Sequence, residues 1–231
     1  MILGIDSSAI TAGCAVCDNG KIIAEQFLNT AHTHSETLLP MVRDMLRGAG
    51  IALSDMESVA VTTGPGSFTG LRIGISTVKG LCSGVGIPCV SVSTLEAIAY
   101  NFIGIDGIIC ACMDARRKQV YNALFKSENG VITRLCEDRA ISLEELFSEV
   151  LKLDGKVYLA GDGAELAERE FSAMGEHKAL LAPLPLRYQR GSGVCLAAFG
   201  KATASPETLM PSYLRIPQAE REKNEREKNV C

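Results

Sequence analysis

The sequence predicts an α/β protein made of two similar units, each with the element order strand–strand–strand–helix–strand–helix. Short runs rich in β-branched residues alternate with longer segments in which apolar residues have helical spacing. Asn19-Gly20 and Asn129-Gly130 each lie between two strand-like runs, and Asn-Gly is typical of a tight hairpin turn. The order of elements in the first half recurs in the second half, which indicates a duplication.

The first unit begins with a three-stranded meander and continues with alternating helices and strands. Its expected elements are strands at 2–7, 12–18 and 21–28, a helix from 34 to about 50, a strand at 57–63, a helix at 68–86, a strand at 88–92 and a helix from about 94 to 102. Thr33 to Glu36 has the form of a capping box, which predicts where the first helix begins. Ser67 is the expected N-cap of the second helix.

The second unit repeats this order. Its expected elements are strands at 107–113, 119–126 and 131–137, a helix at 143–152, a strand at 156–161 and a helix that ends near 174. Ser142 to Glu145 forms another capping-box pattern. The segments around Asp6 and Asp114 occupy the same place in their units. The pattern matches the two-lobed, actin-like and ribonuclease-H-like (ASKHA) architecture of sugar kinases and Hsp70 ATPases, an analogy that concerns the fold and does not settle function.

The chain is expected to divide into two lobes and a tail. Residues 1–103 and 192–217 would form the N-terminal lobe, and residues 104–191 a smaller C-terminal lobe. An apolar helix expected at 194–204 would return the chain to the first lobe. The tail at 218–231 repeats Glu-Arg-Glu-Lys-Asn with balanced charges, and we assign no function to it.

Composition narrows the class of protein. The 231 residues are 47% hydrophobic and carry a formal net charge of −4, so any contact with RNA is expected to be shared with a partner. We find no leader-like start and no apolar run near the ~18 residues that span a bilayer, which together predict a cytoplasmic protein. The nine cysteines are scattered, and the Cys14/Cys17 pair is expected to be buried in the core as thiols.

Polar residues at the two hairpin tips are candidates for a phosphate-binding site. Asp6, Ser7 and Ser8 follow the first strand, where actin-like ATPases use an acid and hydroxyls to organise Mg²⁺ and phosphates. Asp114 occupies the equivalent place in the second unit, but the basic residues after it would crowd a phosphate. The alternative, which we favour, is that these residues close hairpins and cap strands.

Metal and nucleophile sites have weak support. His32 and His34 are two residues apart, whereas a helical zinc pair requires i, i+4 spacing on one face, so no metal is expected. Ser67 lies in a Gly-Ser-Phe-Thr-Gly string that lacks the spacing of a nucleophile elbow. No cofactor is therefore expected.

Two long helices of the first unit have faces that suggest close packing with another backbone. The candidate residues are Leu38, Leu39, Val42, Met45 and Leu46 on the first helix and Gly70, Gly74, Val78 and Leu81 on the second. Glycines four residues apart cost helix stability and are tolerated where another backbone must approach. The pattern fits either tight packing within the lobe or a docking face for another protein.

Seven motifs in a fixed order resemble the TsaB (YeaZ) family. They are Ile2–Ser8, His34–Glu36 with Leu38–Pro40, Gly64–Gly74, Gly86–Pro88, Leu95-Glu96, Asp114–Arg117 with Val120-Tyr121, and Pro211–Arg215. The chain is also similar to TsaD, the catalytic paralogue, whose H-x-x-x-H motif binds a metal. Thr94 and Ile98 stand where those histidines would be, and neither can replace an imidazole as a metal ligand.

The resemblance implies a non-catalytic subunit of a tRNA-modifying complex. TsaB-like proteins pair with TsaD, the ATPase TsaE joins them, and the complex forms N6-threonylcarbamoyladenosine at position 37 of tRNA. It further implies docking through the two long helices and a homodimer when TsaD is absent. Charge reversal at Leu39, Met45 and Gly74 is then expected to abolish TsaD binding in a folded monomer. Two other classes remain open, an autonomous ATP-dependent phosphotransferase using Asp6 and Asp114, and a metallopeptidase.

Overall fold

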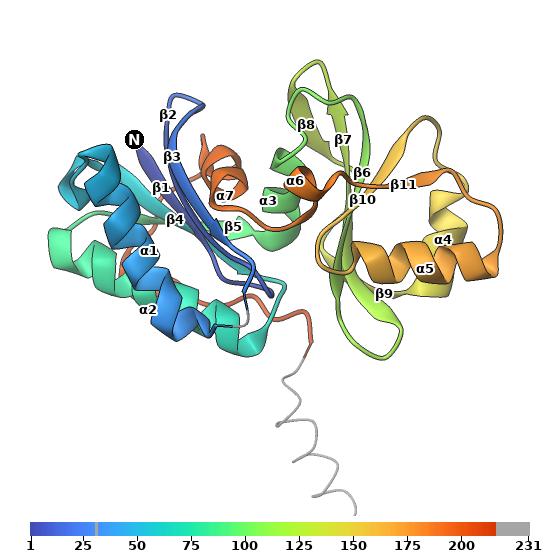
Figure 1. Ribbon diagram of the computed structural model, residues 1–231, viewed down its shortest axis with the longest axis horizontal. Helices are drawn as coiled ribbons and strands as arrows, with labels where there is room; N and C mark the ends of the chain where they lie inside the picture. Colours follow the sequence, from blue (N-terminus) through green and yellow to red (C-terminus); the bar gives the residue numbers. More distant parts are fainter. Residues whose placement is uncertain (31, 216–231) are drawn as a thin grey trace, which may run out of the picture.

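The protein consists of two β-sheets that lie beside each other and carry helices on their faces (Figure 1). A computed structural model describes residues 1–30 and 32–215. The charged tail expected at 218–231 therefore lies outside the described residues. We call the sheet that begins with β1, with its helices, the N-terminal lobe, and the sheet that begins with β6, with its helices, the C-terminal lobe.

The sheet of the N-terminal lobe has the strand order β3-β2-β1-β4-β5. Its strands are β1 (Ile2–Asp6), β2 (Ala12–Asp18), β3 (Lys21–Leu28), β4 (Ser58–Gly64) and β5 (Cys89–Ser93). Strands β1, β2 and β3 form an antiparallel meander, and β4 and β5 extend the sheet in parallel with β1. The expected meander is confirmed.

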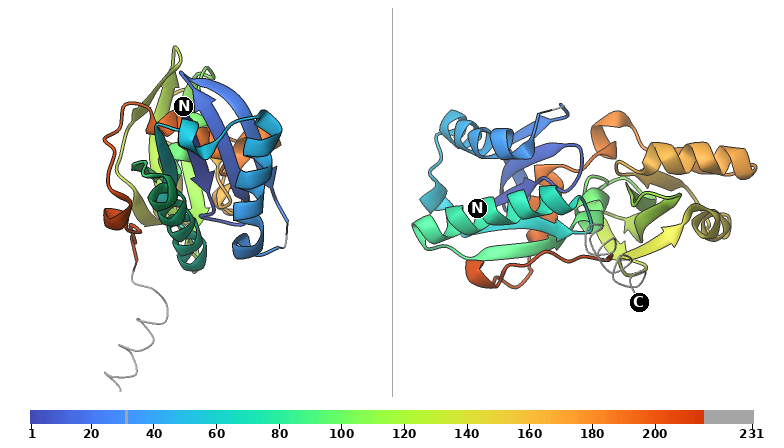
Figure 2. Two further views of the ribbon diagram at one scale, coloured as in Figure 1. Left: turned by 90° about the vertical axis from the view of Figure 1, so that its left-hand side faces the viewer. Right: turned by 90° about the horizontal axis from the view of Figure 1, so that it is seen from below.

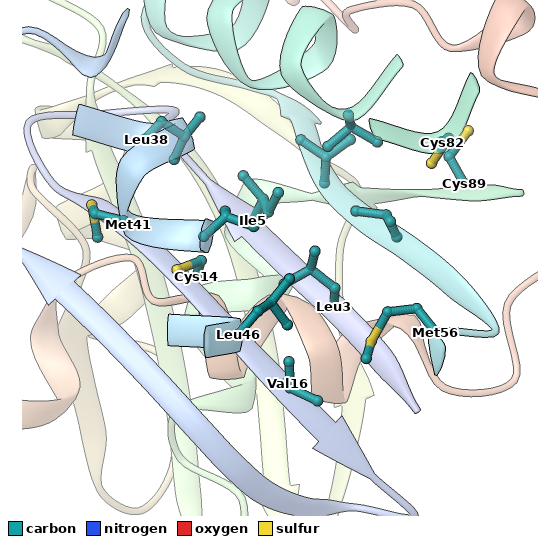
Figure 3. Close-up of a cluster of buried hydrophobic side chains, with 14 of the residues drawn as sticks. Leu3, Ile5, Cys14, Val16, Leu38, Met41, Leu46, Met56, Cys82 and Cys89 are labelled. Atoms are coloured by element: carbon teal, nitrogen blue, oxygen red, sulfur yellow. The ribbon is translucent and has the colours of Figure 1, made fainter. Parts of the chain in front are cut away.

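Alternate residues of these strands pack against helices on opposite faces of the sheet, as the two-residue period of a strand requires. One face, with Leu3, Ile5 and Val16, packs against α1 (His34–Ala49) and α2 (Phe68–Val85) (Figure 3). The other face packs against α3 (Thr94–Tyr100) and α7 (Gly191–Ala198). Helices α1 and α2 lie side by side, which the views in Figure 2 also show.

The sheet of the C-terminal lobe has the same arrangement, in the order β11-β10-β6-β7-β8. Its strands are β6 (Gly107–Asp114), β7 (Gln119–Glu128), β8 (Val131–Arg134), β9 (Arg139–Ser142), β10 (Val157–Ala160) and β11 (Ala179–Leu181). Helices α4 (Leu143–Val150) and α5 (Ala164–Met174) pack on one face, and α3 packs on the other. Two sheets with one topology confirm the duplicated, actin-like fold.

Several element boundaries differ from the sequence-based expectation. The strand expected at 131–137 is shorter, because β8 ends at Arg134. The separate strand β9, which was not expected, pairs with the other half of β7. Strand β11 and the short helix α6 (Leu184–Arg187) were not expected. The helix expected at 194–204 is α7, which begins earlier, at Gly191, and ends earlier, at Ala198. A glycine at 191 lets the start of the helix approach the backbone of β2 closely.

The three expected caps have different outcomes. Ser142 forms the full capping box with Glu145, and the hydroxyl of Ser67 accepts from the amide of Gly70, so both predictions are confirmed. Thr33 precedes α1 as expected, but its side chain caps no amide and contacts the Ser35 hydroxyl. The capping box predicted for α1 is therefore wrong.

Helix α3 joins the two lobes. Its side chains Leu95 and Ile98 belong to a cluster with β6 and β7, whereas Ala97 packs with Val194 of α7 against the first sheet. Cys14 and Cys17 are free, buried thiols in β2, as expected. The residue limits given above for the two lobes stay predictions.

Candidate partner-docking groove and interlobe cavity

The glycines that begin α2 hold the tip of the β1–β2 hairpin. An added Cβ on Gly66 would collide with the carbonyl oxygen of Ser8, and one on Gly70 with the carbonyl oxygen of Ser7. A Cβ on Gly74 would collide with the Ser7 hydroxyl. The same hydroxyl donates to the carbonyl of Gly70 at 2.9 Å. The backbone that approaches these glycines is therefore that of the chain itself.

This arrangement shows where the residues of the expected docking face lie, although docking itself stays a prediction. Gly70 and Gly74 are buried against Ser7, so the alternative of packing within the lobe is the correct one for the glycines. The other buried candidates are Leu38, Val42, Met45, Leu46 and Val78, and Leu81 is half-buried against the same core. These side chains pack the two helices on the sheet, and the buried ones face the core of the lobe.

Leu39 is the exception among the candidates, since 52% of its surface is exposed. It lines a groove of about 560 Å³ between the first parts of α1 and α2. The lining of this α1–α2 groove comprises His34, Ser35, Leu39, Phe68, Thr69, Arg72, Ile73, Ser76 and Thr77. The ring of His34 hydrogen-bonds the carbonyl oxygen of Ala9 at 2.7 Å, which ties the start of α1 to the β1–β2 tip.

Sequence reasoning missed the α2 side of this groove. Gly70, Gly74 and Val78 form one row on α2 and face the β1–β2 tip and the core. Thr69, Ile73 and Thr77 form the adjacent row with the same spacing and line the groove. The signal was present, because residues one position away from a buried i, i+4 row lie at the edge of the exposed face.

A second cavity, of about 590 Å³, lies between the lobes. It is lined by the β1–β2 tip, the start of α2, the β6–β7 tip and the segment 212–215. Among its charged residues are Asp114, Asp162, Arg116 and Arg215. We call it the interlobe cavity. Phe68 lines both this cavity and the α1–α2 groove.

The hydroxyls at the first hairpin tip already have partners. Asp6 is fully buried and accepts from the Ser8 amide at 3.2 Å and from the Ser8 hydroxyl at 3.0 Å. Burial raises the pKa of Asp6, although the hydrogen bonds from the Ser8 amide and hydroxyl oppose the rise. Of the candidates at this tip, Ser8 lines the cavity. These contacts are those expected if the tip is structural.

The acids on the C-terminal side of the cavity are similarly engaged. Asp114 accepts from the Arg116 amide at 2.7 Å and pairs with the Arg116 guanidinium at 3.3 Å. Asp162 accepts from the side-chain amide of Gln189 at 2.9 Å. Burial raises the pKa of Asp162 to about 6, and the neighbouring charges of Asp114 and Asp6 add to the effect.

Metal-ligating residues do not converge in the part of the chain that the structure describes. Within residues 1–30 and 32–215, no group of three or more His, Cys, Asp or Glu side chains could hold an ion. Thr94 and Ile98 are fully buried in α3, and Ile98 packs in the cluster between α3 and the C-terminal lobe. In the same residues, no helix has the length and apolar composition needed to cross a bilayer.

Comparison with known proteins assigns the chain to a family. A family model described as TsaD, tRNA N6-adenosine threonylcarbamoyltransferase, matches residues 21–220. The Bacillus subtilis (strain 168) protein named tRNA threonylcarbamoyladenosine biosynthesis protein TsaB is 32% identical over 219 residues, covering 95% of this chain and 96% of that protein. The chain belongs to the TsaB (YeaZ) family, so the resemblance inferred from the motifs is confirmed.

Other members of the TsaB family match along nearly the whole length. The Escherichia coli (strain K12) protein of the same name is 32% identical and covers 93% of this chain and 94% of its own length. A solved structure of YeaZ from Pseudomonas aeruginosa has a TM-score of 0.76 at 29% identity, covering 92% of this chain and 99% of that chain. The fold described here is therefore that of a solved family member.

Proposed function

We propose that the chain is a non-catalytic subunit of the machinery that forms N6-threonylcarbamoyladenosine at position 37 of tRNA. In this proposal it docks TsaD through the α1–α2 groove, TsaE joins the complex, and tRNA is contacted indirectly through the partners. Membership of the TsaB family carries the proposal. Thr94 and Ile98, at the positions of the metal-binding histidines of TsaD, support a role without metal chemistry.

The α1–α2 groove supports the docking part of the proposal. It combines exposed apolar surface on Leu39 and Phe68 with a cation, Arg72, and the hydroxyls of Ser76 and Thr77. An apolar centre surrounded by polar groups is typical of protein–protein interfaces. When TsaD is absent, the same surface would pair two copies of this chain as a homodimer in the cytoplasm.

Binding variants at the groove test this proposal. Leu39→Asp combined with Ile73→Asp should weaken TsaD binding at least about 30-fold, because removing interface anchors costs about 2 kcal/mol or more. Met45 and Gly74, which looked suitable from the sequence, are buried, so charges there would unfold the lobe. The affinity would be measured by calorimetry, and thermal unfolding would confirm that the variant is folded.

Val131→Asp is the matched control, since Val131 is 61% exposed on β8 of the other lobe. It should bind TsaD like the unchanged chain. Reconstitution of tRNA modification with and without this chain tests the wider proposal. A groove variant that binds TsaD with unchanged affinity would refute the docking surface, and modification at full rate without the chain would refute the role itself.

The rival functions make different predictions for the isolated chain. An autonomous ATP-dependent phosphotransferase of the sugar-kinase type requires tight Mg-ATP binding through Asp6 and Asp114. Asp6 is buried and Asp114 is paired with Arg116, so neither is arranged for that task. Calorimetry with Mg-ATP would reveal a phosphotransferase, and metal analysis of the purified protein would reveal a metallopeptidase.

A further inference from the structure

We propose that residues Pro211–Arg215 act as a strap that links the two lobes across the interlobe cavity and holds Phe68 and Arg72 of the α1–α2 groove in place. The strap would make the docking groove sensitive to the arrangement of the lobes. The part of this inference that concerns partner binding rests on the proposed function. The part that concerns coupling within the chain is tested without a partner.

The strap begins with a backbone anchor on the N-terminal lobe. The amide of Ser212 donates to the carbonyl of Thr63, at the end of β4, with a distance of 2.7 Å. The carbonyl oxygen of Ser212 occupies the space that a Cβ on Gly64 would need. Gly64 also has a φ of +140°, a conformation that residues other than glycine rarely adopt. The glycine at 64 is therefore required where the strap crosses the end of β4.

The middle of the strap contacts the groove through Tyr213. The ring of Tyr213 stacks on the ring of Phe68 with centroids 5.1 Å apart. The guanidinium of Arg72 lies on Phe68 at 3.8 Å from the ring centroid, and its Nε donates to the Tyr213 hydroxyl at 3.1 Å. Three side chains thus contact one another, and one of them, Phe68, lines both the groove and the cavity.

The end of the strap contacts the C-terminal lobe through Arg215. Its guanidinium donates to the carbonyl of Ala115, in the β6–β7 tip, at 2.8 Å. The same group lies 5.9 Å from the ring centroid of Tyr121 on β7. Five consecutive residues therefore span from β4 and α2 of one lobe to the β6–β7 hairpin of the other.

These contacts connect the α1–α2 groove with the interlobe cavity, whose linings have no charged residue in common. A partner that packs against Phe68 changes the surface on which Tyr213 stacks, and any separation of the lobes pulls on Tyr213 through Arg215. The coupling acts through packing in a short, extended segment, since an aromatic pair and one hydrogen bond contribute about 1–2 kcal/mol together. Tyr213 and Arg215 are positioning residues in this proposal, because they act on the groove through Phe68 and Arg72.

Hydrogen exchange of the full chain tests the coupling directly. Arg215→Ala removes the contact with the C-terminal lobe and leaves Phe68 and Arg72 unchanged. We expect amide exchange in peptides covering residues 66–76 and 113–122 to become about threefold to tenfold faster, as expected when about 1 kcal/mol of local stability is lost. Met210→Ala is the control, because Met210 is 68% exposed just before the strap, and it should leave both peptides within about twofold.

Partner affinity provides the second measurement. Tyr213→Ala should weaken TsaD binding about tenfold, the fold-change of 1.4 kcal/mol, whereas Tyr213→Phe keeps the stacked ring and should lose less. If Arg215→Ala leaves exchange at 66–76 unchanged, the coupling is refuted. If the unchanged chain binds no TsaD but Arg215→Ala still accelerates exchange at 66–76, the strap stands and the proposed docking function fails.

Discussion

The two lobes share one topology, but the residues at their first hairpin tips differ in burial and charge. The β1–β2 tip carries Ser7 and Ser8, which are buried under the glycine-rich start of α2. The β6–β7 tip carries Arg116, Arg117 and Lys118, which are exposed and all have positive φ values. The duplicated fold therefore brings both tips to one cavity, whereas the residues at each tip decide what the cavity can bind.

A phosphate site at this place needs free hydroxyls or amides on both tips. In the first tip the Ser7 hydroxyl, the Ser8 hydroxyl and the Ser8 amide are all engaged within the chain. In the second tip the Asp114 carboxylate is engaged with Arg116. The strands of the two lobes have the same order, but their first hairpin tips differ. The β1–β2 tip is closed, meaning that these polar groups are bonded within the chain, whereas the β6–β7 tip carries exposed charges.

A substitution that opens the closed tip should destabilise the protein most. Gly70→Ala places a methyl group against the carbonyl oxygen of Ser7. Ser7 directly follows β1, so its backbone cannot move away without disturbing that strand. We expect a loss of about 3 kcal/mol or more in the free energy of unfolding, as for overpacked cores. Urea denaturation measures this loss.

Gly80→Ala is the matched control in the same helix, because nothing lies near an added Cβ at that position. It should raise stability by up to about 1 kcal/mol, since alanine has the higher helix propensity. Equal losses for both substitutions would show that the tip is not closed by the glycine contact.

The next prediction concerns the pH dependence of stability that arises from Asp162, which lines the interlobe cavity. Asp162 has its pKa raised from 3.8 to about 6, so the folded protein binds a proton more tightly than the unfolded chain. Stability therefore falls as pH rises from about 4 to about 6, and remains lower above that range. Asp162→Asn, whose amide oxygen can still accept from Gln189, should remove this loss.

The gain for Asp162→Asn at pH 8 is up to about 3 kcal/mol, from a rise of about two pKa units, and it should vanish near pH 4. Thermal or urea unfolding across this pH range measures it. A variant that gains the same stability at pH 4 and pH 8 would contradict the assignment to Asp162 ionisation.

The smallest effect compares helix starts in the two lobes. Ser142→Ala removes a full capping box from α4 and should cost about 1 kcal/mol. Thr33→Ala, before α1, should cost much less, because the Thr33 side chain caps no amide. Chemical denaturation of both variants measures the pair, and similar costs would contradict the difference between the two caps.

Much of the fold could be predicted from local patterns. The Asn-Gly turns and the alternating apolar runs located the meanders, and Ser67 and Ser142 marked two helix starts, because all of these signals act over a few neighbouring residues. The early end of β8 and the presence of the separate strand β9 were not predictable in this way. They arise from pairing with the two halves of β7, which is a long-range contact.

The candidate site was predicted less well. Helical spacing identified Leu39 together with Leu38, Val42, Met45 and Leu46, but spacing alone does not say which side of a wide apolar stripe meets the sheet. The two helices lie on one face of the first sheet, and the side chains chosen as the docking face are mostly those that pack the helices on it, while the docking role of the helices stays a prediction.

The amino-acid sequence was sufficient to identify the family, the duplicated order of elements and the absence of imidazoles at Thr94 and Ile98, because motifs and residue types are properties of the chain. The three-dimensional contacts were needed to show which backbone the glycines of α2 approach and that Pro211–Arg215 reaches from Thr63 to Ala115. The reason is physical: a glycine records that something must come close, but which backbone comes close depends on residues more than fifty positions away.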